Sequence, residues 1–455
     1  MQPGSDETSN PPLPQNAMKA LFKSRAWRFA VMIALTLVMC VPLMMVSFVI
    51  SDRVSFKREA MQDVTRQWGG PIKLSGVVMV LPVVREVEKV VAGDLMGDRA
   101  ETETKPAPPI LLTPDTLSIK TDGTSEMRRR GIFEVPVYAT DLTAQMDFQI
   151  ARVASVLQEG ETIRWKDARL AVIMPGSRSF SAEAVLQSGD KRFDLEPGTT
   201  LKNQSGIHAS IGDPRGVNRF SLALQLNGAQ TLSFAPAGRT TEVSMTSNWP
   251  DPSFIGKPLP QEREVTAEGF TARWEISHLA RDLPQTWRGD WRGTTTFGVR
   301  LFNPVDIYQQ VERAAKYGIL FISLTFLTVF LIERFSSRPA HAAQLLLIGV
   351  AQCVFFLLLL SFAEQIGFAR AYMIAAVATI GLISAYGRSA LDLGRTVWAL
   401  IGSLTALYGT LYLILRSADY ALLAGSLLGF AAVALAMFLT RGDDWSRARG
   451  EQQPA

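Results

Sequence analysis

Six apolar stretches divide the chain unevenly, and this pattern constrains the fold more than any other feature of the sequence. One stretch stands alone near the amino terminus, five crowd into the last third, and a more polar segment, Ser51 to Lys316, separates them. A helix needs roughly 20 apolar residues to cross about 30 Å of hydrocarbon. Phe29 to Ile50 has this length and contains no charge. The sequence therefore predicts a multi-pass membrane protein with one large domain on one side.

The five later stretches predict five further spans, so that the transmembrane bundle has one plus five α-helices. Tyr317 to Ile332 is the shortest, at about 24 Å of helix, so Lys316 must snorkel to the interface. The others are Gln344 to Phe362, Ala371 to Tyr386, Val397 to Leu415 and Ala421 to Thr440. We therefore divide the chain into a disordered tail at 1–28, a first span at 29–50, an external domain at 51–316, a five-helix region at 317–440 and a second tail at 441–455.

The basic residues near the span ends predict the orientation, because short loops rich in Lys and Arg stay in the cytoplasm. With the amino terminus inside, the cytoplasmic set is Lys19, Lys23, Arg25, Arg28, Arg334, Arg338, Arg388, Arg395, Arg441, Arg447 and Arg449. The short loops of the other face carry only Arg370 and Arg416. We expect both termini in the cytoplasm and the large domain on the opposite side of the membrane.

The net charge and the cysteines narrow the partners and the compartment. The net charge of +4 and the pI near 9.0 follow from the cytoplasmic flanks, so we expect no nucleic-acid partner. Cys40 and Cys353 both fall inside predicted spans, which leaves the external domain without a disulfide. Its size must then supply the stabilising core. A cleaved signal peptide is the alternative for the first span, but its apolar run is longer than the usual 7 to 15 residues.

The external domain begins with helical periodicity and then changes to strand periodicity. Ser51 to Trp68 continues the first helix outward until Gly69, Gly70 and Pro71 stop it. Alternating apolar residues then mark strands. These residues are Phe133, Val135 and Val137; Leu222, Leu224 and Leu226; Phe270, Ala272, Trp274 and Ile276; and Phe297, Val299 and Leu301. Frequent turn residues separate these runs, so a large, mainly antiparallel β-sandwich-like domain fits best.

Three local signals add detail to this domain. Asn227 and Gly228, between two apolar runs, predict a hairpin turn. Gly93 to Pro109, rich in Gly, Pro and Glu, predicts an exposed loop. At the exit, Asn303 caps a helix that Pro304 starts, with Asp306 near the positive end of its dipole. One helix is therefore predicted from Pro304 through Arg334 into the membrane.

The usual motifs of hydrolases, zinc proteases and nucleotide-binding loops are absent from the sequence. The three histidines, His208, His278 and His341, cannot form one external metal site because His341 is predicted to be cytoplasmic. One acidic cluster could serve sugar or phosphate chemistry, and it is also what a solvated face looks like. Its members are Asp251, Glu262, Glu264, Glu268, Glu275 and Asp282. We therefore nominate no catalytic, cofactor-binding or metal-binding residue.

The spans themselves give little sign of transport, because Glu364, Asp392 and Asp419 lie at span ends or in loops. Polar residues within the spans predict hydrogen bonds between helices instead. They are Thr325, Thr328, Gln352, Ser384 and Thr405. In the last span Ala421, Gly425 and Gly429 are spaced four apart, so Gly425 and Gly429 are candidate helix-packing positions, either within the bundle or at a dimer seam.

Several segments of the chain are distinctive when they are taken together. They are TSNWPDPSFIGKPLPQEREVTAEGFTARWEISHLARDLPQ at Thr246 to Gln285, YQQVERAAKYGILFISLTFLTVFLIE at Tyr308 to Glu333, FAEQIGF at Phe362 to Phe368, and SADYALLAGS and TRGDDW near the carboxyl terminus. Together they resemble the CreD family of inner-membrane proteins of Gram-negative bacteria. The resemblance implies a cytoplasmic-membrane protein with a periplasmic domain, associated with cell-envelope integrity and, in some bacteria, with the output of a two-component system. It implies no reaction and no cofactor.

The segment from Asn248 to Leu283 is the best candidate for a functional surface. Its Pro-rich aromatic loop either closes the sandwich as a lid or binds a partner. The candidate interaction residues are Asn248, Trp249, Pro250, Phe254, Arg273, Trp274 and Asp282. The leading hypothesis is a non-enzymatic envelope protein, anchored in the lipid bilayer, that binds an envelope lipid, glycan or protein. A membrane enzyme acting on lipid or cell-wall glycan and a transporter are the alternatives.

Overall fold

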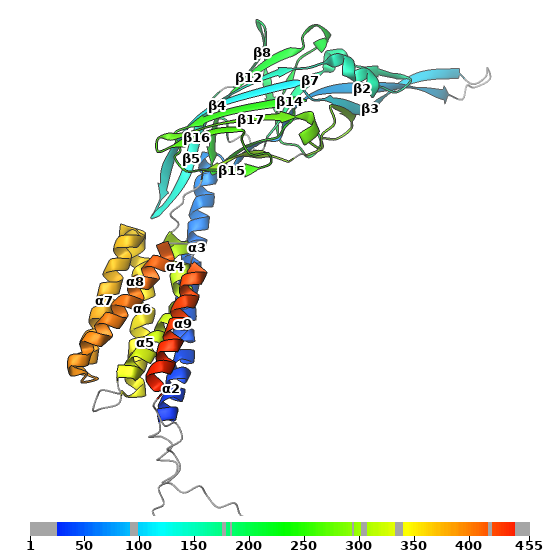
Figure 1. The fold of residues 1–455 in the computed structure, drawn as a ribbon. Helices are drawn as coiled ribbons and strands as arrows, with labels where there is room; N and C mark the ends of the chain where they lie inside the picture. The colour runs from blue at the N-terminus through cyan, green and yellow to red at the C-terminus, as the bar shows by residue number, and fades with distance from the viewer. Residues whose placement is uncertain are drawn as a thin grey trace, which may run out of the picture. The chain divides into compact units, whose positions relative to one another are not determined.

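The computed structural model describes residues 25–91, 99–174, 179–182, 184–293, 295–301, 307–332, 340–416 and 421–441. The chain forms two compact units, and Figure 1 shows the elements of each. One unit, Lys57–Pro304, is rich in strands. The other combines Met1–Phe56 with Val305–Ala455 and is helical. We call them the sheet unit and the membrane unit.

The membrane unit contains α2 (Arg25–Val38), the first part of α3 (Cys40–Trp68), α4 (Ile307–Lys316), α5 (Gly318–Ile332), α6 (Ala342–Ile366), α7 (Phe368–Ser389), α8 (Val397–Arg416) and α9 (Ala421–Thr440). Within the described residues, four helices are long and apolar enough to cross a membrane, or five if α4 and α5 form one bent span. The last predicted span coincides with α9. The arrangement of one plus five spans stays a prediction.

The predicted single helix from Pro304 to Arg334 is wrong, because α4 and α5 meet at an angle of 45° around Tyr317. The two parts have different surroundings. α4 buries one stripe that includes Tyr308 and Val311, whereas α5 is apolar on all sides. Gly318, the first residue of α5, packs so closely that a Cβ there would lie 2.8 Å from Leu43 Cδ2. The predicted cap at 303–306 lies outside the described residues.

Polar side chains link helices inside the membrane unit, as predicted for three of the five span residues. The amide of Gln352 on α6 donates to Thr325 Oγ1 on α5 at 2.6 Å. Thr328 on α5 and Ser403 on α8 share a hydrogen bond of 3.0 Å between their hydroxyls. Such bonds favour one arrangement of helices in a medium that offers no water to unpaired groups.

The sheet unit contains three sheets. The four-stranded sheet has the order β1 (Ile72–Leu74), β13 (Thr231–Phe234), β19 (Phe297–Leu301) and β15 (Pro252–Gly256). The seven-stranded sheet has the order β10 (Leu195–Pro197), β11 (Gly206–Ser210), β7 (Arg169–Ile173), β2 (Gly76–Val91), β3 (Arg99–Leu112) and β18 (Thr286–Arg288), with β6 (Glu161–Ile163) paired to β2.

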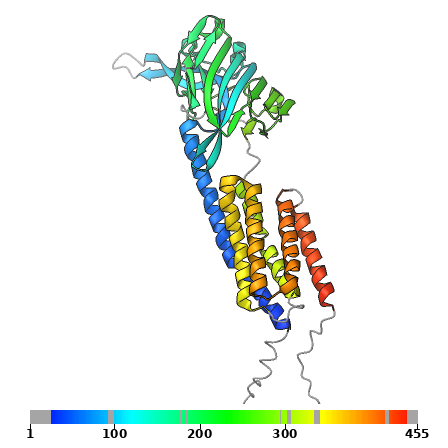
Figure 2. The ribbon, with the colours of Figure 1, turned by 90° about the vertical axis from the view of Figure 1, so that its left-hand side faces the viewer.

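The eight-stranded sheet has the order β16 (Glu262–Thr266), β17 (Gly269–Ser277), β14 (Thr240–Ser247), β4 (Thr116–Arg130), β5 (Phe133–Asp147), β12 (Arg219–Ala229), β8 (Val185–Ser188) and β9 (Lys191–Phe193). The described pairings are antiparallel except for β1 with β13 and β14 with β4. Figures 1 and 2 show the curved, twisted strands of this unit from two directions. The mainly antiparallel character expected from the sequence is therefore present.

One continuous apolar core lies between these sheets, and its residues come from all three. Three of the four predicted alternating runs, those of β12, β17 and β19, lie in this core, whereas Val135 and Val137 of β5 are buried on the other face of their strand, against α3. In β17, Phe270, Ala272, Trp274 and Ile276 are buried, whereas the residues between them are exposed. A second cluster on the other face of β2 packs Val78 and Val80 against Trp287 and Trp291. The first part of β2, from Val77 to Leu81, is therefore buried on both sides.

The hairpin predicted at Asn227 and Gly228 is wrong. β12 runs through both residues while paired to β5, and the chain leaves for the four-stranded sheet only at Gln230, whose φ is 65°. The reason is a close approach. A Cβ at Gly228 would lie 2.4 Å from the hydroxyl oxygen of Tyr138, so the glycine makes room for that ring inside a strand.

The loop predicted at Gly93 to Pro109 is also corrected. Residues 99–109 belong to β3 and pair with β2 in a long hairpin, and 92–98 lie outside the described residues. β18 pairs with β3 from Ile110 to Leu112, and the Pro109 carbonyl accepts one further bond from the Gly289 N–H at 2.9 Å, so Pro106 and Pro108 lie beyond the β18 pairing. Proline is tolerated there because its missing N–H breaks no ladder.

Candidate functional site

The loop that follows β14 joins two strands through Asn248. Its Oδ1 accepts from the backbone N–H of Ser125 at 2.7 Å, and its Nδ2 donates to the Ser125 carbonyl at 3.2 Å. β14 pairs with β4 only as far as Ser247 and Gly123. The Asn248 side chain thus imitates one further backbone pair of this parallel ladder, which fixes the end of β14 against β4.

The other predicted interaction residues divide into an interior group and an exposed group. Trp249 and Trp274 are buried in the main core, and Trp274 is 0% exposed. Phe254 packs edge-on against Trp274, with ring centroids 6.0 Å apart. Pro250, Arg273 and Asp282 are exposed. The structure therefore does not bring the seven residues together on one face.

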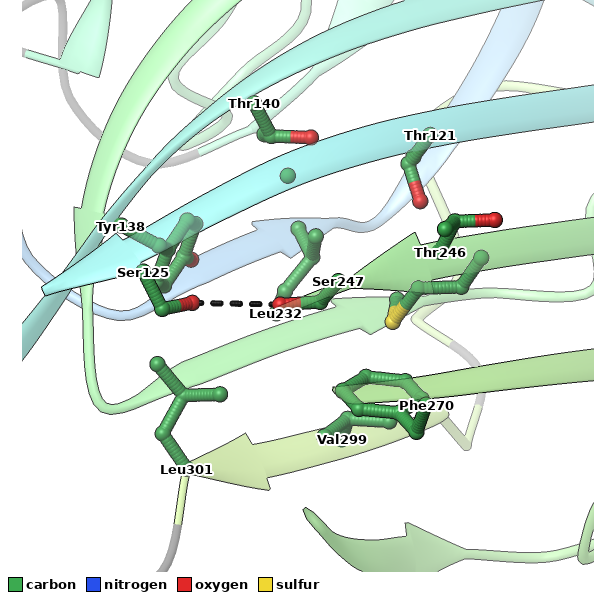
Figure 3. A pocket seen from close by; sticks show the side chains of 12 residues that line it. Thr121, Ser125, Tyr138, Thr140, Leu232, Thr246, Ser247, Phe270, Val299 and Leu301 are labelled. Atoms are coloured by element: carbon green, nitrogen blue, oxygen red, sulfur yellow. Dashed lines mark hydrogen bonds between the residues drawn. The ribbon is translucent and has the colours of Figure 1, made fainter. Parts of the chain in front are cut away.

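A narrow slot opens next to Asn248, between the eight-stranded and four-stranded sheets (Figure 3). Hydroxyl groups from β4, β5 and β14 line one side, and apolar side chains from β13, β17 and β19 line the other. Ser125 and Ser247 hydroxyls lie 3.2 Å apart across its mouth. The slot encloses about 20 Å³, which is room for about one water molecule.

Two buried hydroxyl groups, those of Thr121 and Tyr138, decide what the slot can hold. Thr121 Oγ1 has no hydrogen-bond partner among the described atoms, and it faces the slot in Figure 3. The Tyr138 hydroxyl donates to the Thr231 carbonyl at 2.7 Å, and burial raises the pKa of Tyr138 far above its usual value. A water in the slot would complete the bonds of Thr121, and an organic ligand would not fit.

A larger groove lies at the opposite edge of the eight-stranded sheet, where the chain changes sheets. β9 is the last strand of the eight-stranded sheet and β10 is the first of the seven-stranded sheet, with only Asp194 between them. The groove formed at this crossover, which we call the edge groove, has a volume of about 380 Å³. That is within the range of small-molecule sites, roughly 300 to 1,000 Å³.

The edge groove has an apolar floor and an ionic rim. Phe180, Ala184, Phe193 and Ile207 form the floor, and Phe193 continues into the core through its contact with Phe220 at 5.9 Å between ring centroids. The rim carries the exposed charges Arg192, Asp194 and Glu196. Such a site suits an amphipathic molecule that buries an apolar part and keeps a polar part in water.

Sequence analysis missed the edge groove. The only signals were the turn residues at Ser188 to Asp190 and at Pro197 to Gly198, which enclose two very short strands. His208 lies beside the groove, where its Nδ1 is 2.7 Å from the Gly198 carbonyl and its Nε2 is 3.7 Å from Glu196 Oε2. His278 is half-exposed on a turn after β17.

The acidic cluster from Asp251 to Asp282 is exposed at all six positions. None of the six residues lines the slot or the edge groove. Across the β16–β17 pair Glu262 is opposite Arg273, and across β14–β17 Glu242 is opposite Glu275. Among the described residues, three or more His, Cys, Asp or Glu nowhere gather in a way that could hold a metal ion.

Two buried charges lie outside these sites and support the strands instead. Glu161 on β6 receives hydrogen bonds from Arg288 on β18 and Arg85 on β2, and the bond from Arg288 lowers its pKa to about 2. Arg281, next to Asp282, donates to the Ala237 carbonyl and to Gln285 Oε1, and burial lowers its pKa to about 10.

The two glycines proposed for helix packing differ in their surroundings. A Cβ at Gly425 would lie 3.3 Å from Cε1 of Tyr317, so α9 approaches that ring closely. At Gly429 no atom lies within 4 Å of such a Cβ. Gly429 instead lines an apolar groove of about 660 Å³ between α2, α5 and α9.

Comparison with known proteins identifies similar sequences across nearly the whole chain. A family model described as "Inner membrane protein CreD" matches residues 24–446. The chain is also 31% identical over 427 residues to the Inner membrane protein CreD of Escherichia coli (strain K12). That similarity covers 92% of this chain and 93% of the E. coli protein, so it includes the strands of the edge groove as well as the helices.

Proposed function

The chain belongs to the CreD family of inner membrane proteins, and from that premise we propose that it supports cell-envelope integrity by binding an envelope component in its sheet unit. The edge groove is the observation that carries this proposal, because it combines an apolar floor, an ionic rim and a volume that suits a ligand. The protein acts by binding and is not an enzyme.

The ligand we propose is an amphipathic envelope molecule, such as a lipid. Phe193 and Ile207 are almost fully buried at the floor, so an apolar chain placed there would lose most of its contact with water. Arg192 of the rim suits an anionic headgroup, while Asp194 and Glu196 suit its hydroxyl or ammonium groups. A free glycan or a folded protein partner would make less use of this floor.

The proposal places the sheet unit in the periplasm and both termini in the cytoplasm. The support is the distribution of Lys and Arg around the apolar stretches. A reporter enzyme that folds only in the periplasm should be active when inserted at the Gly189–Asp190 turn and inactive when fused after Arg441. The opposite pattern would reverse the orientation.

Photo-crosslinking in cells tests the groove directly. A photoreactive amino acid at Phe180, in the floor of the groove, should capture an amphipathic molecule that mass spectrometry identifies. The same amino acid at Leu279, which is 86% exposed and outside the groove, is the matched control. Identical adducts at the two positions would refute the groove as a specific site.

Filling the groove tests its role in the envelope. Ala184→Trp places a large ring in the floor of the groove, and Ala280→Trp adds the same ring to an exposed turn. In a strain that lacks the protein, we expect Ala280→Trp to restore detergent resistance and Ala184→Trp to fail at equal protein level. Full restoration by Ala184→Trp would reject the proposal. Turnover of an envelope lipid or glycan by the purified full chain would reject its non-enzymatic part.

A further inference from the structure

The outer part of the β4–β5 hairpin extends beyond its neighbouring strands. We call it the ribbon, and it comprises 124–130 of β4 and 133–136 of β5. β14 accompanies β4 only to Gly123, and β12 accompanies β5 only from Val137. A two-residue turn of Gly131 and Ile132 closes the ribbon. In Figures 1 and 2 this cyan hairpin reaches past the other strands of the sheet unit.

One face of the ribbon is covered by the outer part of α3. Val64 packs with Val135 and Val137 in a small apolar cluster, against which Trp68 also lies. The guanidinium of Arg128 stacks over the Trp68 ring at 4.1 Å, and Arg130 reaches Asp63 at 3.3 Å. A two-stranded ribbon has little stability of its own, so this support keeps it extended.

The other face of the ribbon is exposed toward the turn, whereas Pro136 at its root is buried. Residues two apart in a strand share a face, so Met127 and Arg129 lie opposite Arg128 and Arg130. Met127 is 38% exposed, and Ile132 at the turn is 45% exposed. Arg129 is the most exposed arginine of the three, with 78% of its side chain accessible. The free face therefore combines the apolar Met127 with the Arg129–Glu134 pair, and the apolar Ile132 lies at the tip of the ribbon.

The charge of the ribbon favours an anionic partner. The whole ribbon has three arginines and two glutamates, a net charge of 3 − 2 = +1, and on its free face Arg129 lies opposite Glu134. Arg129 pairs with Glu134 at 2.8 Å, but both side chains are largely in water, where such pairs contribute little. A phosphate group can replace the carboxylate at small cost, because the planar guanidinium binds it through two hydrogen bonds.

We propose that the free face of the ribbon docks on the anionic phospholipid headgroups of the bilayer that holds this chain's own helices. Met127 and Ile132 enter the boundary between headgroups and acyl chains, and Arg129 binds a phosphate. The membrane unit tethers the ribbon to that bilayer, which gives a high effective concentration of headgroups without tight binding. This docking is independent of the edge groove, which is built from other strands.

The test uses the full chain in lipid nanodiscs, with Cys40 and Cys353 replaced by Ala. Ile132→Cys carries a fluorophore that reports polarity and exposure to an aqueous quencher. In discs of phosphatidylcholine with phosphatidylglycerol we expect blue-shifted emission and slower quenching than in phosphatidylcholine alone. Arg129→Gln should lower the ratio of docked to free ribbon about fivefold, and added salt should act in the same direction.

Two matched controls separate docking from general effects. A fluorophore at Asp190→Cys, on the exposed β8–β9 turn, should not respond to lipid charge. Arg219→Gln removes an equally exposed arginine, paired with Asp147 at 3.4 Å on β12, and should leave the Ile132 signal unchanged. Arg129→Lys keeps the charge and should retain part of the response.

Three outcomes would overturn the proposal. The first is an Ile132 fluorophore that stays as accessible as the Asp190 fluorophore in both kinds of disc. The second is a response only to added anionic vesicles, which would assign the ribbon to a different membrane. The third is a response only when another envelope protein is present, which would make the ribbon a protein-docking surface.

Discussion

Two long hairpins, β2–β3 and β4–β5, extend beyond their neighbouring strands, and different interactions stabilise the base of each. The β2–β3 hairpin is held by charge, since Arg85 and Arg288 converge on Glu161, whose side chain is 0% exposed. Beyond Arg85, β3 is the strand that the described residues of β2 pair with. The ribbon of the β4–β5 hairpin is held by apolar packing against α3, and its arginine–glutamate pairs lie in water.

The difference shows that burial decides whether an arginine–carboxylate pair is a fixed part of the structure or can exchange its partner. An enclosed carboxylate must keep its partners, because an unpaired charge in the interior is very unfavourable. The Glu161 cluster is therefore part of the architecture. An exposed pair competes with water at little gain, so its arginine remains available to another anion. The same residue types thus build a fixed root in one hairpin and an available surface in the other.

The substitution Glu161→Gln breaks the first half of this comparison and should have the largest effect. It leaves Arg288 and Arg85 without their carboxylate, so we expect the greatest loss of thermal stability among the changes discussed here. Hydrogen exchange, read segment by segment on the full chain in detergent, should quicken in β6, β18 and the root of β2. Glu134→Gln removes the exposed carboxylate of the ribbon. It should change neither the thermal stability nor the hydrogen exchange of these strands.

The same substitution has a pH signature. Folding lowers the pKa of Glu161 from 4.5 to about 2, so the deprotonated carboxylate stabilises the folded state fully above pH 4.5. That stabilisation is lost as the pH falls from 4.5 toward 2. The stability of the parent protein should therefore fall through this window, while the difference from Glu161→Gln shrinks. A constant difference across the window would show that the carboxylate is not the source.

The substitution Trp68→Ala breaks the second half of the comparison. It removes the ring that packs on the ribbon, the Trp68 Nε1 bond to the Tyr138 carbonyl at 3.2 Å and the stacking with Arg128. We expect a loss of about 3 kcal/mol, at the low end for removal of an aromatic side chain because Trp68 is half-buried. Faster hydrogen exchange should be confined to 124–137 and the end of α3.

Trp165→Ala is the matched control for that substitution. Trp165 is also half-buried and also lies under an arginine, with Arg215 at 5.2 Å from its ring. It packs against the main core far along the chain from the ribbon. Its removal should lower stability without selective exposure of 124–137. Equal exposure of the ribbon in both variants would mean that α3 does not support it.

Much of the sheet unit could be predicted because burial repeats locally. The alternating residues of β12, β17 and β19 mark the faces that these strands bury in the core, without knowledge of any partner strand. The end of α3 at Trp68 also follows from its neighbours, since Gly69, Gly70 and Pro71 cannot continue a helix. The position of a helix or strand and its buried face can therefore be predicted from a few consecutive residues.

The pairing of strands could not be predicted, because it depends on residues far away in the sequence. Asn227 and Gly228 have the composition of a turn, yet the ring of Tyr138 on another strand keeps Gly228 inside β12. The edge groove also depends on distant pairing. β9 pairs with β8 and β10 pairs with β11, and only these pairings show that β9 and β10 belong to different sheets. Local composition carries no such information.

The candidate interaction surface shows why aromatic density is an ambiguous signal. Trp249 and Trp274 are as large and apolar as any binding-site anchor, and they lie inside the core. The same composition serves packing and recognition, and only exposure separates them. Conversely, the exposed apolar residues of the ribbon, Met127 and Ile132, stand beside three arginines and resemble an ordinary solvated turn.

The smallest effect is expected for Arg129→Gln, which sharpens the comparison by separating stability from surface chemistry. Its pair with Glu134 is exposed, so the free energy of unfolding should change by less than about 0.5 kcal/mol. Arg128→Gln also loses stacking on Trp68 and should cost about 0.5 to 1 kcal/mol more. Chemical denaturation of the two variants measures this difference. If Arg129→Gln destabilised the protein as much as Arg128→Gln, the free face would be structural, and its arginine would not be available to bind a phosphate.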